Sequence, residues 1–166
     1  GQGTVFRIHI PVTSAAQPLP PAGAVREIPR GDGERIIFVD DEPAIVRIVE
    51  SMLRRLGYSP LCFTRAQEAA AAFSENPGAF NILITDFTMP QLNGIELARR
   101  MRDLRPDLPV VLASGYIGEK ENEAARERGI HTILQKPISL LLLAEAVREE
   151  LRRARDGGKP PPGRGR

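Results

Sequence analysis

Five polar side chains of this sequence could together perform phosphoryl and metal chemistry, and each follows a short apolar run. They are Asp40, Asp41, Asp86, Ser114 and Lys136. Runs of this kind are typical of buried strands, and the carboxyl ends of parallel strands meet at one edge of a sheet. We therefore expect the five side chains to converge. Three carboxylates, a hydroxyl and an ammonium would form a site for a divalent cation and a phosphoryl group.

The elements that must position these groups alternate between strand and helix. Strands are expected at 35–39, 58–63, 81–85, 109–113 and 131–135. Helices are expected at 43–56, from Thr64 to about Asn76, at 94–104, at 119–128 and from about Ser139 to Arg153. Five strand–helix units of this length predict an α/β fold, a doubly wound parallel sheet with helices on both faces.

Helix boundaries and faces can also be predicted in part. Apolar residues recur at helical spacing in the first helix, at Ile45, Val49, Met52 and Leu56. The second helix is expected to open on a capping box that starts at Thr64.

The last helix is richer in leucine than one buried face requires. Its core face would take Leu140, Leu143 or Ala144, Val147 and Leu151. Leu141 or Leu142 is then left over, either as an ordinary exposed residue or for contact with a partner or in a weak homodimer.

These motifs, taken in order, resemble the receiver domain of two-component response regulators over about residues 33–154. The motifs are Asp40-Asp41-Glu42, Asp86-x-x-Met89-Pro90 with Gly94 beyond, Ser114-Gly115-Tyr116, and Lys136-Pro137. The resemblance implies a flavodoxin-like fold with five helices and strand order 2-1-3-4-5. Periodicity alone does not give that order.

The acidic residues indicate a Mg²⁺ site. Clustered carboxylates repel one another and require a cation or a proton, and hard oxygen ligands favour Mg²⁺. The resemblance implies direct metal contacts from Asp41, Asp86 and the backbone carbonyl of Thr88, with Asp40 acting mainly through water.

The resemblance also assigns the phosphoryl chemistry. Asp86 would be the phosphoacceptor, a carboxylate that forms an acyl phosphate. Ser114 would hydrogen-bond a phosphoryl oxygen, and Lys136 would pair with the phosphoryl group as a point charge. A cis peptide bond is expected between Lys136 and Pro137.

Two positions near the site bear on its regulation. Position 133 is Ile, where many receivers carry an aromatic residue that swings inward on phosphorylation, so the usual aromatic switch is in doubt. Tyr116 lies two residues after Ser114, and we hypothesise that it limits water access and slows loss of the phosphoryl group. The alternative is a surface tyrosine. Thr88 lies near the mouth of the site and could also tune that rate.

The ends of the chain differ in character from the middle. Residues 1–12 resemble the last glycine-rich turn and final strand of a histidine-kinase ATPase domain, residues 13–32 form a Pro/Gly-rich linker, and 155–166 a disordered basic tail. The chain begins with Gly1, so we expect part of a longer protein. The parent would be a hybrid sensor histidine kinase, and this part of it should not bind ATP.

The composition indicates which cellular compartment and which classes of partner to expect. The net charge of +2 does not favour nucleic acid. The single cysteine, Cys62, excludes an internal disulfide and fits a reducing compartment; we read it as a core residue. No run is long enough to span a membrane, so we expect no membrane contact here and a cytoplasmic location, with any anchor elsewhere in the parent.

The sequence therefore predicts a Mg²⁺-dependent receiver that accepts a phosphoryl group from a phosphohistidine domain or a histidine phosphotransfer protein. One alternative is an aspartyl-nucleophile phosphatase of the dehalogenase type, which needs a second aspartate where this chain has Thr88. Another is an interaction domain on the same fold that is never phosphorylated. The complete acidic set and Lys136 argue against that reading.

Overall fold

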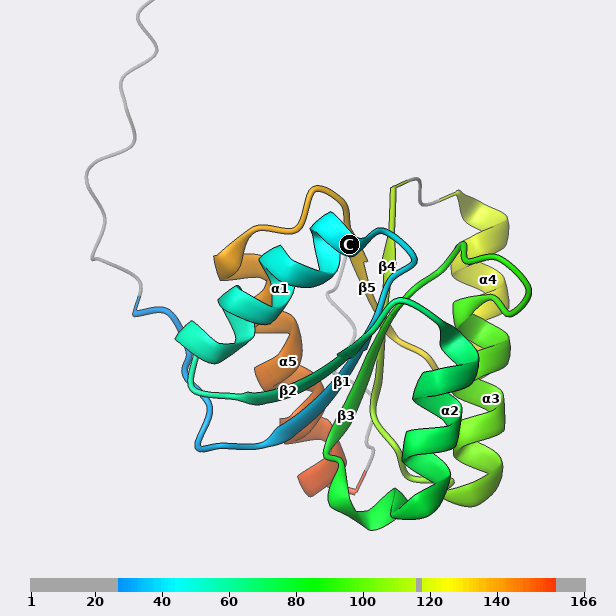
Figure 1. Cartoon of the computed structure of the whole chain (residues 1–166), viewed down its shortest axis with the longest axis horizontal. Coiled ribbons are helices and arrows are strands. Elements are labelled where there is room, and N and C mark those ends of the chain that lie inside the picture. The colour runs from blue at the N-terminus through cyan, green and yellow to red at the C-terminus, as the bar shows by residue number, and fades with distance from the viewer. Residues whose placement is uncertain (1–26, 116–117, 158–166) are drawn as a thin grey trace, which may run out of the picture.

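A five-stranded parallel sheet forms the centre of the molecule. The computed structural model describes residues 27–115 and 118–157. The strands are β1 (Arg35–Val39), β2 (Ser59–Phe63), β3 (Ile82–Asp86), β4 (Val110–Ser114) and β5 (Thr132–Gln135). All neighbours pair in parallel, in the order β2-β1-β3-β4-β5 (Figure 1). The predicted fold class and strand order are confirmed.

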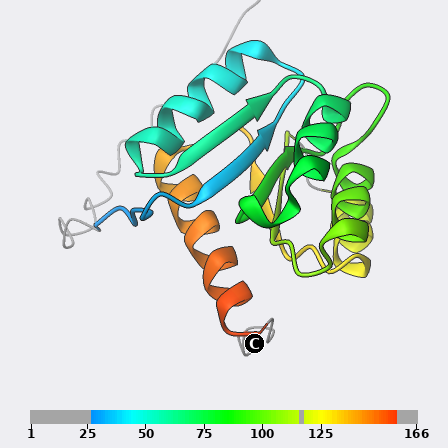
Figure 2. The same cartoon turned by 60° about the horizontal axis from the view of Figure 1, so that its bottom comes forward.

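Helices cover both faces of this sheet. They are α1 (Pro43–Arg55), α2 (Ala66–Glu75), α3 (Gly94–Leu104), α4 (Glu119–Glu127) and α5 (Leu140–Arg155), with a short 3₁₀ turn, η1 (Pro77–Ala79). Helices α1 and α5 lie on one face, and α2, α3 and α4 lie on the other (Figures 1 and 2).

The alternation of side chains along the strands builds two cores. Ile37, Leu83 and Leu112 face α2, α3 and α4. Ile36 and Ile84 face α1 and α5. Because the central strands are covered on both faces, β3 and β4 are buried along their whole length, which explains why they read as unbroken apolar runs.

The buried stripe of α1 agrees with the predicted one at Val49 and Leu56 and differs at the other two positions. Val46, Val49 and Leu53 are buried, whereas Ile45 and Met52 are only half-buried. The helix is therefore rotated so that its stripe falls one residue later than the spacing of Ile45 and Met52 indicated. Both stripes fit a helical period, and only packing on the sheet decides between them.

The start of α2 was also predicted wrongly. The N-cap is Arg65 in an extended conformation, and no side chain caps the helix. The capping box proposed at Thr64 is therefore absent, because the helix begins one residue too late for the Thr64 hydroxyl to serve its first turn.

Helix α5 follows the prediction more closely. The hydroxyl of Ser139 accepts a hydrogen bond from the Leu142 N–H, and Leu143, Val147 and Leu151 are buried. Leu142 is 47% exposed, as expected for a leucine outside the core face. Its use by a partner or a homodimer remains a prediction.

Glu150 is buried in the same helix, which the sequence did not reveal. Its carboxylate accepts hydrogen bonds from the Thr132 hydroxyl and from the Arg153 guanidinium. This network joins the second half of α5 to the start of β5.

The cysteine lies where the sequence placed it. Cys62 packs partly buried against the core shared by α1 and α5, and burial raises the pKa of its thiol to about 12. Among the residues that the structure describes, no helix combines the length and apolar character needed to cross a bilayer.

Candidate functional site

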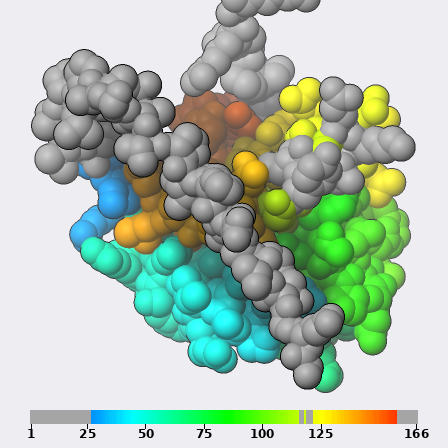
Figure 3. Space-filling model, turned by 90° about the horizontal axis from the view of Figure 1, so that it is seen from above, coloured from blue at the N-terminus to red at the C-terminus, as the bar shows by residue number. Residues whose placement is uncertain are grey.

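The polar groups singled out in the sequence gather at the carboxyl edge of the sheet, at the top of Figure 1. Asp86 and Ser114 are the last residues of β3 and β4, and Asp40 and Lys136 directly follow β1 and β5. Figure 3 looks down on this edge, with α1 and α2–α3 on either side of it. The predicted convergence of four strand ends is thus observed.

Lys136 bridges two buried aspartates. Its ammonium lies 2.7 Å from Asp40 Oδ2 and 2.6 Å from Asp86 Oδ1. Asp40 is fully buried, and Asp86 is 5% exposed. Among the described residues, the Lys136 ammonium is the charged partner of Asp40 Oδ2. Two carboxylates share one cation, which leaves one formal negative charge uncompensated.

Burial and pairing shift the ionisation of this cluster. Burial raises the pKa of Asp86 above its ordinary value, against the opposing effect of the hydrogen bond from Lys136. For Lys136, burial alone would lower the pKa, but the hydrogen bonds to Asp40 and Asp86 outweigh it and the pKa is raised. The ammonium therefore stays charged, while Asp86 is held in a setting that disfavours its negative charge.

Backbone groups fix the orientation of both carboxylates. The Thr88 N–H donates to Asp86 Oδ2 at 2.9 Å, and the Glu42 N–H donates to Asp40 Oδ1 at 3.0 Å. Behind Asp86, Gly94 packs so tightly that an added Cβ would lie 2.2 Å from the Asp86 carbonyl oxygen. A side chain at position 94 would displace the strand end that carries Asp86.

Ser114 and Lys136 are brought together by strand pairing. Ser114 is buried and pairs with Gln135 in the register of β4 and β5, and its carbonyl accepts the Lys136 N–H at 2.8 Å. The peptide bond between Lys136 and Pro137 is cis, as predicted.

The remaining predicted residues differ in their exposure. Asp41 is exposed on the loop after β1, and Thr88 is exposed after β3. Ile133 is half-buried and packs against the core of α2, α3 and α4. Tyr116 lies outside the described residues, as do residues 1–12 and 158–166, so the predictions made for them stay predictions.

The donor set fits a divalent cation in type. Within the residues that the structure describes, no three acidic, His or Cys side chains are close enough to form a ready-made metal site. The uncompensated charge beside Lys136 is nevertheless the kind that a cation offsets, and carboxylate and carbonyl oxygens are the ligands of Mg²⁺.

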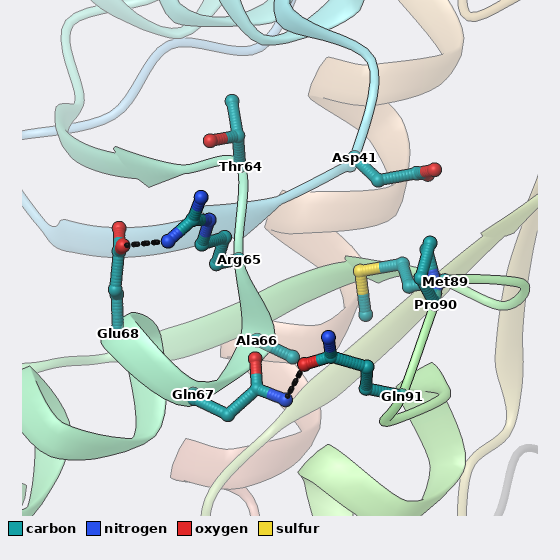
Figure 4. Close-up of a pocket in the computed structure, with 9 residues that line it drawn as sticks. All are labelled: Asp41, Thr64, Arg65, Ala66, Gln67, Glu68, Met89, Pro90 and Gln91. Carbon is teal, nitrogen blue, oxygen red and sulfur yellow. Dashed lines mark hydrogen bonds and ion pairs between the residues drawn. The ribbon is translucent and has the colours of Figure 1, made fainter.

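A shallow pocket of about 550 Å³ opens beside the site and was not foreseen (Figure 4). Asp41 lines one side, and α2 and the loop after β3 line the others. The Gln67 amide donates to Gln91 Oε1 at 2.8 Å across it, and Gln91 adopts a left-handed backbone with φ +66°. Glutamine seldom adopts a left-handed backbone, so the sequence offered no reason to expect one at position 91.

Fold and site together define a class. In a doubly wound sheet of this order, chemistry is expected at the point where the strand order reverses, between β1 and β3, and that is where Asp40 and Asp86 lie. Residues 36–148 match the family model described as response regulator receiver domain. The chain belongs to the response regulator receiver family.

Individual relatives agree with this assignment. The response regulator receiver protein CpdR of Brucella abortus is 30% identical over 118 residues, which cover 71% of this chain and 97% of CpdR. The crystal structure of the receiver domain from hybrid histidine kinase CckA is 35% identical, with a TM-score of 0.59, covering 70% of this chain and 98% of that one.

A longer relative contains the same region. The sensor histidine kinase RcsC of Salmonella typhimurium is 31% identical over 116 residues, which are 70% of this chain but only 12% of RcsC. The share of a relative that this chain spans therefore runs from nearly all of CpdR to about an eighth of RcsC.

Proposed function

We propose that this receiver accepts a phosphoryl group from phosphohistidine onto Asp86 in a Mg²⁺-dependent reaction. The observation that carries the proposal is the position of Asp86. It ends a buried strand, lies 2.6 Å from the Lys136 ammonium and faces the carboxyl edge with Asp40 and Ser114.

The proposed transfer requires few groups. One Asp86 carboxylate oxygen attacks phosphorus, the P–N bond of phosphohistidine breaks, and its electron pair returns to the imidazole nitrogen. The product is an acyl phosphate on Asp86. Lys136, no longer facing a full carboxylate charge there, would pair with the phosphoryl oxygens, and the Ser114 hydroxyl would donate to one of them.

The chain's oxygen donors define where the metal would bind. Mg²⁺, held by Asp41, Asp86 and the Thr88 carbonyl with Asp40 acting through water, would supply positive charge to the phosphoryl oxygens. Asp40 and Lys136 would hold the nucleophile in place and keep its surroundings polar. The acyl phosphate would carry about two negative charges where the Asp86 carboxylate carried one, so Lys136 and the cation would be needed to offset them.

A direct test is chemical phosphorylation. We would incubate the full chain with Mg²⁺ and either acetyl phosphate or phosphoramidate, which carries the P–N bond of the natural donor, and look for an adduct by intact mass. We expect an adduct that is lost with Asp86→Asn or with EDTA. Asp103→Asn, which changes an exposed aspartate on α3, serves as the matched control and should leave the adduct in place.

Each other outcome has a defined meaning. An adduct that survives Asp86→Asn places the acceptor elsewhere. Absence of any adduct, together with no binding of Mg²⁺ and beryllofluoride, would move the interaction-domain alternative to the front. Continuous release of phosphate from small phosphate esters would instead support a phosphatase.

We further propose that the receiver belongs to a hybrid sensor histidine kinase. Residues 1–11 resemble the end of a kinase ATPase domain, and the chain is similar to the receiver of hybrid kinase CckA and to part of RcsC. The donor would then be the phosphohistidine of a kinase or a histidine phosphotransfer protein. The location would be the cytoplasm, where kinases find ATP. Transfer from the phosphorylated kinase core of the parent to Asp86, measured by radiolabel, tests this; no transfer within minutes contradicts it.

A further inference from the structure

Residues 28–34, which we call the strap, lie against the domain although most of them precede both the predicted domain start and the family match at residue 36. The Gly31 N–H donates to the Leu56 carbonyl at 2.8 Å, and the Gly33 N–H donates to the Gly57 carbonyl at 2.9 Å. These bonds hold the strap on the corner where α1 ends and β2 begins (Figure 2).

The fit at this corner is steric as well as polar. A Cβ on Gly31 would lie 2.1 Å from the Tyr58 ring, and one on Gly57 would lie 2.6 Å from the Gly31 carbonyl oxygen. Gly33 and Gly57 both adopt positive φ, +92° and +89°. The backbone of Gly31 therefore requires glycine at position 57, and the Tyr58 ring leaves no room for a side chain at position 31.

Glu34 connects the strap to a third element. Its carbonyl accepts the Ser59 N–H at 2.9 Å, which continues the pairing toward β2. Its carboxylate accepts the Asp32 N–H at 2.7 Å and a hydrogen bond from Arg155 at 3.1 Å. Arg155 is the last residue of α5, so the Glu34 carboxylate connects the turn within the strap to the end of α5.

The aromatic ring beneath the strap confirms that the corner is closed. Tyr58 is 6% exposed. Burial, and then the nearby Glu34 carboxylate, raises the pKa of the Tyr58 phenol to about 12. The strap therefore covers a side chain that would otherwise meet solvent.

We propose that the strap is a coupling element: it docks on the α1–β2 corner through Gly31 and Gly33, fixes where the incoming chain enters the domain, and links that point to the last turn of α5 through Glu34 and Arg155. The corner is thus an interaction surface whose occupant is the chain's own upstream segment. The coupling lies at the amino edge of the sheet, opposite Asp86.

Amide hydrogen exchange on the full chain tests the docking. In the wild-type protein we expect the Gly31 and Gly33 amides to exchange at least roughly tenfold more slowly than in the unfolded chain. Gly31→Ala should remove that protection, because the methyl group cannot fit against Tyr58. Gly78→Ala, whose added Cβ would have only an Asn76 side-chain atom at 3.8 Å, is the matched control and should leave it intact.

A second variant tests the link to α5 without disturbing the fold. Arg155→Gln should speed exchange in the last turn of α5 and in the strap together, by roughly two- to fivefold for an exposed ion pair. Arg65→Gln removes an ion pair at the start of α2 whose arginine is about as exposed as Arg155, and it should change neither.

The outcomes separate the two halves of the proposal. Unprotected Gly31 and Gly33 amides in the wild-type chain would show that the strap is not docked and would overturn the proposal. Protected strap amides with no response to Arg155→Gln would refute the coupling to α5. If Gly31→Ala prevents folding, the wild-type and Arg155→Gln measurements still decide both points.

Discussion

Removal of the Lys136 ammonium is the sharpest test of the electrostatics of the site. Lys136→Met keeps the apolar stem of the side chain but removes the cation that the two aspartates share. Asp40 is fully buried, so water cannot solvate its charge in place of the ammonium. Breaking a buried ion pair from one side costs about 3–5 kcal/mol. Because the Lys136 side chain is 17% exposed, we expect the lower end, about 3 kcal/mol.

That loss is large enough to measure simply. For a domain of this size, about 3 kcal/mol lowers Tm by roughly 12 °C. Urea and thermal unfolding would be followed by far-UV circular dichroism in EDTA, since the chain has no tryptophan. The double variant Lys136→Met/Asp86→Asn should regain about half of the lost stability, because only one buried carboxylate remains.

Mg²⁺ provides an independent readout of the same variant. With the ammonium gone, the carboxylates are free to bind a cation, so Mg²⁺ should raise the Tm of Lys136→Met by more than it raises that of the wild type. Arg54→Met, which removes an exposed cation on α1, is the control. A Lys136→Met protein within about 1 kcal/mol of the wild type at neutral pH would refute a closed, buried bridge in solution.

Three further predictions concern stability. Asp86→Asn should raise Tm at neutral pH, because the pKa of Asp86 is raised in the native state and ionisation above that pKa costs native stability. The gain in Tm should shrink as the pH falls through that pKa. Thermal scans across pH would measure it, and an equal gain at every pH would contradict the prediction. Gly94→Ala should cost about 1–3 kcal/mol in urea unfolding because of the clash with the Asp86 carbonyl, whereas Gly78→Ala should change little; equal effects would refute the tight packing. Gln91→Gly should stabilise the protein by about 0.5 kcal/mol, because relief of the left-handed backbone outweighs the loss of one exposed hydrogen bond. Gln67→Ala removes only that hydrogen bond and should destabilise the protein slightly. Destabilisation by both variants would show that the hydrogen bond dominates.

Much of the fold could be predicted because its elements are marked locally. Apolar runs such as 82–85 are typical of strands buried on both faces, and Gly57, Asn76 and Pro106 mark the ends of the first three helices. Convergence of Asp40, Asp86, Ser114 and Lys136 followed from the geometry of a parallel sheet. The helix faces were harder, because α1 could bury either of two adjacent stripes.

Other features depend on tertiary contacts that no local pattern encodes. The left-handed backbone of Gln91 and the burial of Glu150 depend on partners distant in sequence. Gly31 looked like a linker residue because glycine is common in linkers. Only the Tyr58 ring packed against it shows that the absence of a side chain is required there.

Because the strap contacts the end of α5, the polypeptide enters and leaves the domain on the same side. Glu34 and Arg155 are joined directly, so the polypeptide enters and leaves within a short distance, at the edge of the sheet away from Asp86. A domain with adjacent leads can be spliced into a longer chain as an insertion, or be circularly permuted, without stretching its sheet. In either arrangement the edge that carries Asp86 would remain turned outward, available to whatever approaches it.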